Sequence, residues 1–185
     1  SQISHEAINA LNYAFLLMML PLGLFGMSLA TAIFPTLADH AAGNRHDQLH
    51  STLAQTLRLT MFLVVPASVG LVLVREPLIA MLFERGEFSA ASTAITSSAL
   101  LYYGIGLWAQ GVVEVLSRGF YALGDTATPV KAAVLAMGMN LVASVVLKGP
   151  MGFEGLALAL SIASIGEAIV LYLLLREQMG PLEEG

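Results

Sequence analysis

Long runs without a charged residue constrain this chain more strongly than any motif. Five apolar runs divide the sequence. Four of them have no charged residue, and the last has one, Glu167. They cover residues 7–38, 59–74, 88–113, 132–147 and 155–175. A helix needs about 20 mostly apolar residues to cross the hydrocarbon core of a bilayer. Two of the runs reach that length alone, and the others reach it when a terminal charged side chain extends to the interface.

The composition supports the same interpretation. Charged residues make up 11% of the chain, whereas a soluble domain carries about 25%. Apolar residues make up 57%, and the mean hydropathy is +0.78. This number of charged residues is too small to cover the surface of a soluble protein. The chain also lacks cysteine, which excludes disulfides. Its net charge is −5, and it has no run of basic residues of the kind that binds nucleic acid.

We therefore predict an all-α fold, a polytopic membrane bundle of about five transmembrane helices. The connections between them are short, which implies antiparallel neighbours. Ser89 and Thr128 are expected to cap helices, the latter with Pro129 as the first helical residue. The chain begins without Met, without a signal peptide and almost directly with an apolar segment, so we expect a single partial domain over 1–185. The predicted helices lie near 8–37, 50–82, 90–121, 129–148 and 153–176.

Basic residues indicate an orientation, because cytoplasmic loops are enriched in Lys and Arg. One end of the predicted bundle holds slightly more of them than the other. That end carries Arg45, Arg58, Arg118, Lys131 and Arg176, and the opposite end carries Arg75, Arg85 and Lys148. The bias places Arg45, Lys131 and Arg176 at the cytoplasmic face and the N-terminus outside.

Few polar side chains lie inside the predicted spans. Glu114 and Arg118 have the i, i+4 spacing and the order that favour an ion pair. We favour a structural pair slightly over a pair that lines a polar cavity. Glu167 lies deep in its helix, and an ionisable residue at that depth is a functional-site hypothesis. The alternative, which we weigh equally, is that it reaches water near the cytoplasmic face.

Small residues recur every fourth position in the last two predicted helices. Such stripes let helix backbones approach closely in lipid, and this packing role is the favoured interpretation. The more specific, alternative hypothesis is that Asn140 and Glu167, which lie on these stripes, face a cavity. The stripes comprise Ala132, Ala136, Asn140 and Ser144 in one helix, and Gly155, Ala159, Ala163 and Glu167 in the other.

Nothing in the sequence predicts catalysis, a cofactor or a metal site. The histidines lie near helix ends without a completing ligand, and there is no nucleophile triad, phosphate loop or catalytic carboxylate pair. Proline lies inside the predicted helices at Pro21, Pro35 and Pro66, where it is expected to kink them. Bent helices of this kind are common beside transporter sites, although many structural helices carry them as well.

Four stretches resemble, in order, segments of the MurJ/MviN-type lipid II flippases, within the multidrug/oligosaccharidyl-lipid/polysaccharide exporter superfamily. They are LNYAFLLMMLPLGLFGMSLATAIFPTLADHAA (11–42), MLFERGEFS (81–89), SRGFYALGDTATPVK (117–131) and PMGFEGLALALS (150–161). The resemblance implies fourteen helices in two lobes around a cationic cavity, of which this chain would be most of the second lobe. It further implies alternating access by rocking lobes, which moves lipid-linked peptidoglycan precursor across the bacterial inner membrane without an enzymatic step.

The chain departs from that pattern at its candidate cavity-facing positions. Directly after the matching Asn-Tyr-Ala, which begins at Asn12, the family usually has an acidic or amide residue and then an arginine. This chain has Phe15 and Leu16 at those two positions. Glu114 stands where a basic residue is frequent, and Glu167 where an amide is expected. Alternatives therefore stay open: an exporter of another polyprenyl-linked glycan or an organic cation, or a non-transporting scaffold. The partners implied are the bilayer, a lipid-linked glycan and the missing first lobe of the same parent chain.

Overall fold

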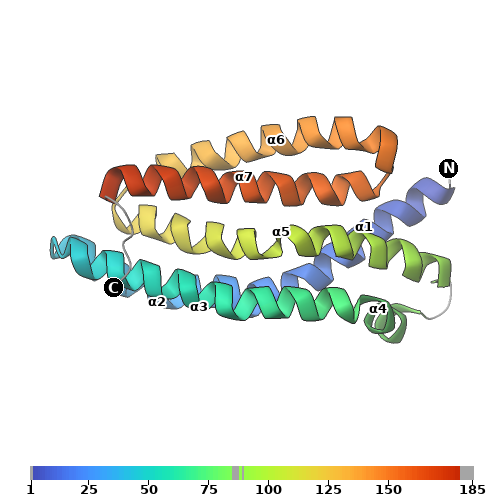
Figure 1. Cartoon of the computed structure of the whole chain (residues 1–185), viewed down its shortest axis with the longest axis horizontal. Helices are drawn as coiled ribbons and strands as arrows, with labels where there is room; N and C mark the ends of the chain where they lie inside the picture. The colour runs from blue at the N-terminus through green and yellow to red at the C-terminus, as the bar shows by residue number, and fades with distance from the viewer. Residues whose placement is uncertain (1, 85–87, 89, 180–185) are drawn as a thin grey trace.

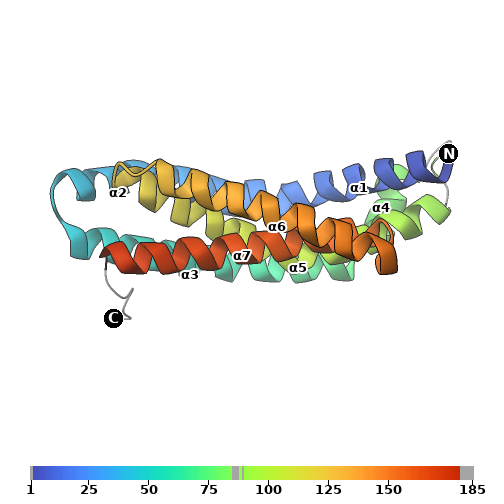
Figure 2. The same ribbon diagram turned by 90° about the horizontal axis from the view of Figure 1, so that it is seen from above.

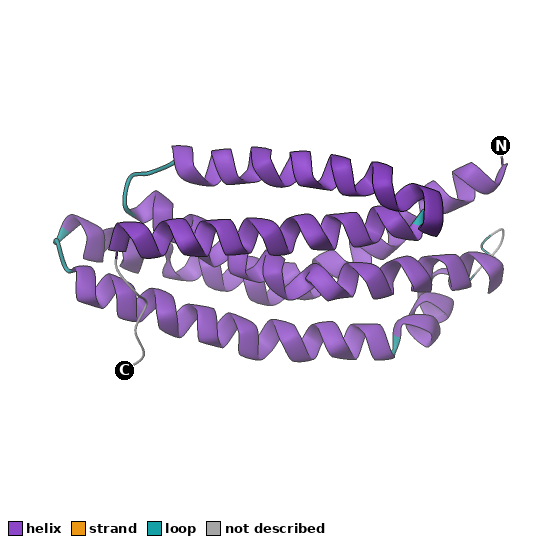
Figure 3. Ribbon diagram, turned by 45° about the horizontal axis from the view of Figure 1, so that its top comes forward, coloured by secondary structure: helices purple, strands orange, loops and turns teal. Residues whose placement is uncertain are grey.

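A computed structural model describes residues 2–84, 88 and 90–179, and within them the chain is helical with no strand (Figure 1, Figure 3). The membrane-length helices run up and down along one long axis, and the short helix α4 lies at one end of the bundle. They are α1 (Gln2–Pro21), the π-helical η1 (Leu22–Met27), α2 (Ser28–Ala42), α3 (His46–Leu73), α4 (Arg75–Phe83), α5 (Ala90–Ala122), α6 (Ala127–Met151) and α7 (Glu154–Met179).

Among the described residues, five helices are long and apolar enough to cross a membrane. This confirms the predicted all-α membrane helix bundle. The first of them is assembled from α1, η1 and α2, and it continues to Ala42, beyond the predicted end at 37. The five helices span Ile8–Ala42, His46–Leu73, Ala90–Ala122, Ala127–Met151 and Glu154–Gln178.

The prolines lie inside these helices in different settings. Pro21 is the last residue of α1, and the chain then forms the π-helical segment η1 before α-helix resumes. A proline lacks the N–H that an α-helix requires, and π-helical turns are one way in which a helix accommodates such an interruption. Pro35 lies within α2 and Pro66 within α3, both exposed.

The predicted helix over 50–82 is wrong as a single element. The structure ends α3 at Leu73 and begins a separate nine-residue helix, α4, at Arg75. Pro77 explains the break, because it has no N–H for the Leu73 carbonyl and its ring would clash there. The Arg75 guanidinium donates a 2.8 Å hydrogen bond to the Val72 carbonyl and so caps the end of α3.

The central element is α5, which packs against α1, α2, α3, α4 and α7. Its glycines allow close approach: a Cβ on Gly106 would lie 2.5 Å from Ser161 Cα of α7. The buried Ser161 hydroxyl donates to the Tyr102 carbonyl (2.6 Å) and accepts from the Gly106 N–H (3.1 Å). From the other side, Ser68 of α3 donates to the Gly104 carbonyl (2.7 Å). Hydrogen bonds from Ser161 of α7 and Ser68 of α3 thus hold the same turn of α5 from two sides.

Helices α6 and α7 form a hairpin in which α6 packs mainly on α7 (Figure 2). A Cβ on Gly155 would lie 2.6 Å from the Leu147 carbonyl oxygen, so the two backbones approach closely. The small residues of both stripes that contribute to this contact are buried, as the packing interpretation requires. They are Ala132, Ala136, Gly155, Ala159 and Ala163.

Candidate functional site

A stripe of polar side chains runs along one face of α5, and we call it the α5 stripe. It consists of Tyr103, Gln110, Glu114, Arg118 and Tyr121. These positions are separated by seven, four, four and three residues, which places them on one side of a helix. The remaining faces of α5 pack on other helices, with close approach through Gly104, Gly106, Gly111 and Gly119.

The α5 stripe begins beside α1. The ring of Tyr103, which is buried, meets the ring of Phe15 edge to face at 6.1 Å between centroids. One turn further along α1, the Met18 sulfur accepts a 3.9 Å contact from the Gln110 amide. Phe15 therefore belongs to this face. Leu16 and Asn12 are exposed, with 58% of the Leu16 surface accessible.

Further along the stripe, the predicted ion pair is present. Arg118 Nη2 lies 3.7 Å from Glu114 Oε2, with side chains 31% and 29% exposed. The guanidinium carbon of Arg118 lies 5.9 Å from the centre of the Tyr121 ring, a cation–π distance. Its Nε is buried and has no hydrogen-bond partner in the described part of the chain. Glu114 and Tyr121 together hold this cation in place.

Glu167 of α7 approaches the same ion pair. It is half-buried, and Glu114 lies within electrostatic reach of it. Within the described residues, Glu167 has no hydrogen bond and no ion pair of its own. Glu114 therefore pairs with Arg118 and also lies within electrostatic reach of a second carboxylate, Glu167. The sequence did not predict this meeting of α5 and α7.

A hollow of about 280 Å³ lies between α6 and α7, and it contains both Asn140 and Glu167. We call it the α6–α7 hollow. The Asn140 side-chain oxygen also accepts a 3.5 Å hydrogen bond from Ser144. The hypothesis that Asn140 and Glu167 face one cavity agrees with this geometry. The lining residues are Ala133, Ala136, Met137, Asn140, Leu160, Ala163, Ser164 and Glu167.

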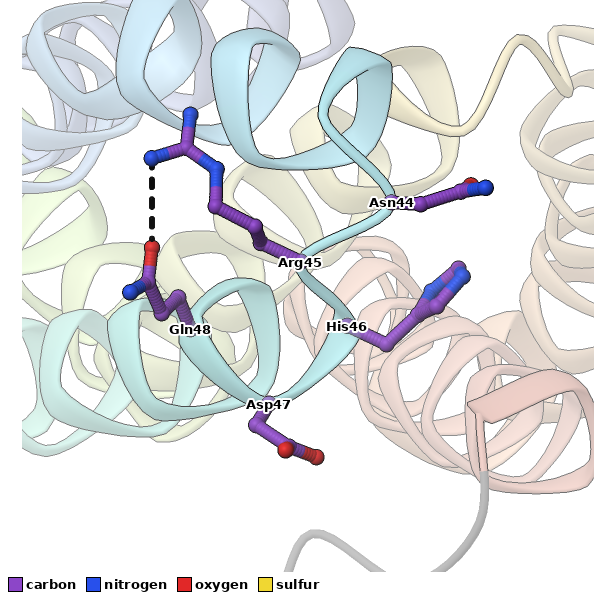
Figure 4. Close-up of a pocket in the computed structure, with 5 residues that line it drawn as sticks. All are labelled: Asn44, Arg45, His46, Asp47 and Gln48. Atoms are coloured by element: carbon purple, nitrogen blue, oxygen red, sulfur yellow. Dashed lines mark hydrogen bonds between the residues drawn. The ribbon is translucent and has the colours of Figure 1, made fainter.

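The basic residues assigned to the cytoplasmic face belong to elements that meet at one end of the bundle. Arg45 lies in the α2–α3 turn, Lys131 in the second turn of α6 and Arg176 near the end of α7 (Figure 1). The Arg45 guanidinium donates to the Gln48 side chain (3.3 Å) and to the Asp39 carbonyl (3.0 Å). Figure 4 shows this arrangement, with His46 and Asp47 pointing away from the guanidinium. Among the described residues there is no metal-ligand cluster.

Sequence reasoning missed Asp125, which organises the α5–α6 turn. Its Oδ1 accepts hydrogen bonds from the Ala127 and Thr128 N–H groups, both at 3.0 Å. Its Oδ2 accepts from the Thr128 hydroxyl (2.6 Å) and from Gln178 at the end of α7 (3.2 Å). The expectation that Thr128 caps this helix is wrong, because α6 begins at Ala127 and Asp125 supplies the capping oxygen. The other expected cap, Ser89, lies outside the described residues.

These bonds make Asp125 a pH-dependent contributor to stability. The Thr128 hydroxyl first, then the Thr128 N–H and Gln178, lower its pKa from 3.8 to about 2. A lowered pKa means that the charged form stabilises the fold above the ordinary pKa and that this contribution disappears as the pH falls toward about 2. Asp125→Ala is expected to lower the unfolding temperature in detergent at neutral pH. The difference from the unsubstituted chain should shrink between pH about 4 and about 2.

The exposed Glu177→Ala is the matched control for this measurement, because Glu177 makes no hydrogen bond among the described residues. It should leave the unfolding temperature and its pH profile unchanged. A difference for Asp125→Ala that stays constant down to pH about 2 would contradict the role of the carboxylate charge.

Membrane-length helices around a central helix that carries ionisable and amide side chains on one face define a polytopic helical membrane protein. A family model described as "Lipid II flippase MurJ" matches residues 1–184. The chain therefore belongs to the MurJ lipid II flippase family, which confirms the resemblance found in the sequence.

Relatives and a solved structure agree with this assignment. A "Probable lipid II flippase MurJ" of Vibrio cholerae is 35% identical over 90% of this chain and 32% of its own length. "Lipid II flippase MurJ" of Burkholderia cenocepacia is 32% identical over 96% of this chain and 34% of its own. The solved structure "Lipid II flippase MurJ, inward closed conformation" superimposes with a TM-score of 0.83 at 32% identity, over 92% of this chain and 36% of that one. The chain thus spans about a third of these proteins.

Proposed function

We propose that this chain is part of the second lobe of a flippase that moves lipid II, the lipid-linked peptidoglycan precursor, across the bacterial inner membrane. The observation that carries the proposal is the structural likeness to a lipid II flippase over nearly the whole chain. The protein would act by alternating access as a multi-pass membrane transporter, without an enzymatic step, cofactor or metal. Residues 1–185 would form one partial domain and would need the first lobe of the same parent chain as a partner.

In this proposal the α5 stripe, the α6–α7 hollow and the exposed face of α1 form one wall of the transport pathway. Asn12, Phe15, Leu16, Glu114, Arg118, Asn140 and Glu167 would be its substrate-facing residues, and Pro21, Pro35 and Pro66 would shape the helices around it. The described part of this wall carries two carboxylates, Glu114 and Glu167, and one guanidinium, Arg118, so its net charge disfavours anions. A pyrophosphate would need charge-assisted hydrogen bonds from cations. Those cations would have to come from the first lobe.

The acidic character of this wall favours a second candidate function. A carrier of a cationic or zwitterionic substrate would use Glu114 and Glu167 directly, and the apolar side chains of Phe15 and Leu16 would remove competing positive charge. A transporter of another polyprenyl-linked glycan is compatible with the same wall when the first lobe is basic. The scaffold alternative rests on Phe15 and Leu16 alone.

Complementation by the full-length parent distinguishes these functions. In a strain depleted of its own lipid II flippase, the parent is expected to restore growth and cell shape. Restored growth would reject the scaffold function, whereas failure despite normal abundance in the membrane would reject lipid II as the substrate. The control is a parent without residues 1–185, which should not restore growth because alternating access needs both lobes.

A further inference from the structure

The short helix α4 has one face fixed against the bundle. Ile79 is fully buried, and the Phe83 ring packs 4.7 Å from the Tyr13 ring of α1. Phe88 completes this aromatic cluster, at 5.7 Å from Tyr13 and 6.1 Å from Phe83 between ring centroids. These contacts determine which side of α4 faces the bundle and which side faces away.

The side that faces away is apolar. Met81 is 66% exposed and Leu82 is also exposed. No residue from Pro77 to Phe83 carries a charge. Glu76 is exposed on another side of the helix, because five residues separate it from Met81, a rotation of about 140°. In water this exposed apolar surface would be unfavourable.

The apolar side of α4 continues a surface of α3. Phe62, Val69 and Leu73 form an exposed apolar stripe along that membrane-length helix, and Leu73 at its end is 74% exposed. Val74, between the two helices, is exposed as well. Exposed apolar residues therefore continue from α3 through Val74 to the outward side of α4, past the charged residues at the start of α4. This continuity identifies lipid as the partner of the exposed side of α4.

The length and direction of α4 determine how it meets lipid. Nine residues make a helix of about 13.5 Å, which is too short to cross a hydrocarbon core of about 30 Å. Figure 1 shows α4 nearly end-on, so it runs across the long axis of the bundle. Charged residues flank the helix at both ends: Arg75, held by the Val72 carbonyl and 3.7 Å from Glu76, at its start, and the exposed Glu84 directly after Phe83.

We propose that α4 is an interfacial helix that inserts Met81 and Leu82 into the lipid leaflet at the end of the bundle where α6 turns into α7. It anchors the end of α3 at the membrane surface, since helices of this kind lie in the interface with their apolar side in the acyl region. The anchor does not depend on which substrate the parent carries.

The absence of cysteine in this chain makes a depth measurement direct. A nitroxide spin label is placed at Met81→Cys in the full-length parent in liposomes, after serine replaces any cysteine elsewhere. Collision rates are then measured with O2, which concentrates in lipid, and with a water-soluble nickel chelate. The ratio of O2 to nickel accessibility is expected to exceed one at position 81 and to fall below one for Glu76→Cys. Phe62→Cys on α3 serves as the lipid-exposed reference, and Asp47→Cys as the aqueous one.

Each outcome at position 81 is decisive. A ratio close to that of Phe62→Cys, or intermediate but above one, supports the interfacial helix. A ratio like that of Asp47→Cys means that the apolar side of α4 lies in water and overturns the proposal. Low accessibility to both reagents means that another part of the parent covers α4, which overturns it as well. Because Met81 is exposed, the label should not disturb packing, and circular dichroism checks this.

Discussion

Replacing Gly106 with alanine is expected to force α5 and α7 apart and to destabilise the bundle by about 1–3 kcal/mol, the usual cost of overpacking. The added Cβ would lie 2.5 Å from Ser161 Cα. That atom belongs to the backbone and cannot rotate away, so a whole helix must move. The same displacement would lengthen the hydrogen bonds that Ser161 makes with α5. Unfolding of the full-length parent in detergent, followed by circular dichroism, measures the loss.

Gly138→Ala is the matched control for this substitution. Gly138 is also helical, and a Cβ there would meet no atom within 4 Å. Since alanine favours helix over glycine by about 1 kcal/mol, this variant should be unchanged or slightly stabilised. Equal destabilisation by the two variants would show that the contact between α5 and α7 is looser than the structure describes.

Leu16→Arg is expected to strengthen the binding of an anionic, pyrophosphate-bearing substrate by the parent. Leu16 is 58% exposed and follows Phe15 in α1, so an arginine fits there without displacing core residues. A hydrogen bond to a charged group contributes about 1.5–3 kcal/mol. The lower value is appropriate at a hydrated site, and it corresponds to about a tenfold lower Kd. Binding of lipid II to the purified parent, measured with and without added salt, tests this expectation.

Leu16→Gln separates charge from polarity in this experiment. Glutamine offers a hydrogen-bond donor on a shorter side chain without a positive charge, so it should produce little of the gain. High salt should also reduce the gain from arginine, because an exposed charge is screened. If Leu16→Arg leaves Kd unchanged, then Leu16 does not face the substrate, and the α1 face is not part of the pathway wall.

The membrane fold could be predicted from the sequence because lipid penalises charge so strongly that uncharged runs mark the spans. The same signal did not separate α3 from α4, because Arg75 and Glu76 interrupt the apolar residues only briefly before they resume at Pro77. The break comes from Pro77, which has no N–H for the Leu73 carbonyl. The stripe spacing favoured helix packing and raised, as the alternative, a cavity faced by Asn140 and Glu167. The approach of Glu167 to Glu114 was not predictable, because it depends on how α5 and α7 cross.

Capping was the other part that local patterns did not predict correctly. Thr128 before Pro129 has the expected form of a helix start, and the hydroxyl does take part in the turn. The capping oxygen comes from Asp125, which also binds Gln178 far away in the sequence. A contact between residues so distant in the sequence can be seen only once the arrangement of the helices in space is known.

The π-helical segment η1 has a consequence for the rotational phase of the first membrane helix. Residues at every fourth position from Ala10 to Ala30 are buried. In an ideal α-helix of 3.6 residues per turn, a stripe with that spacing advances by about 40° at each step and would wind away from α5. Over the five steps from Ala10 to Ala30 the drift would be about 200°, and the wider turns of η1 offset roughly half of it, about one residue of rotation. The π-helical turns therefore help to keep the first membrane helix packed on α5 on both sides of Pro21.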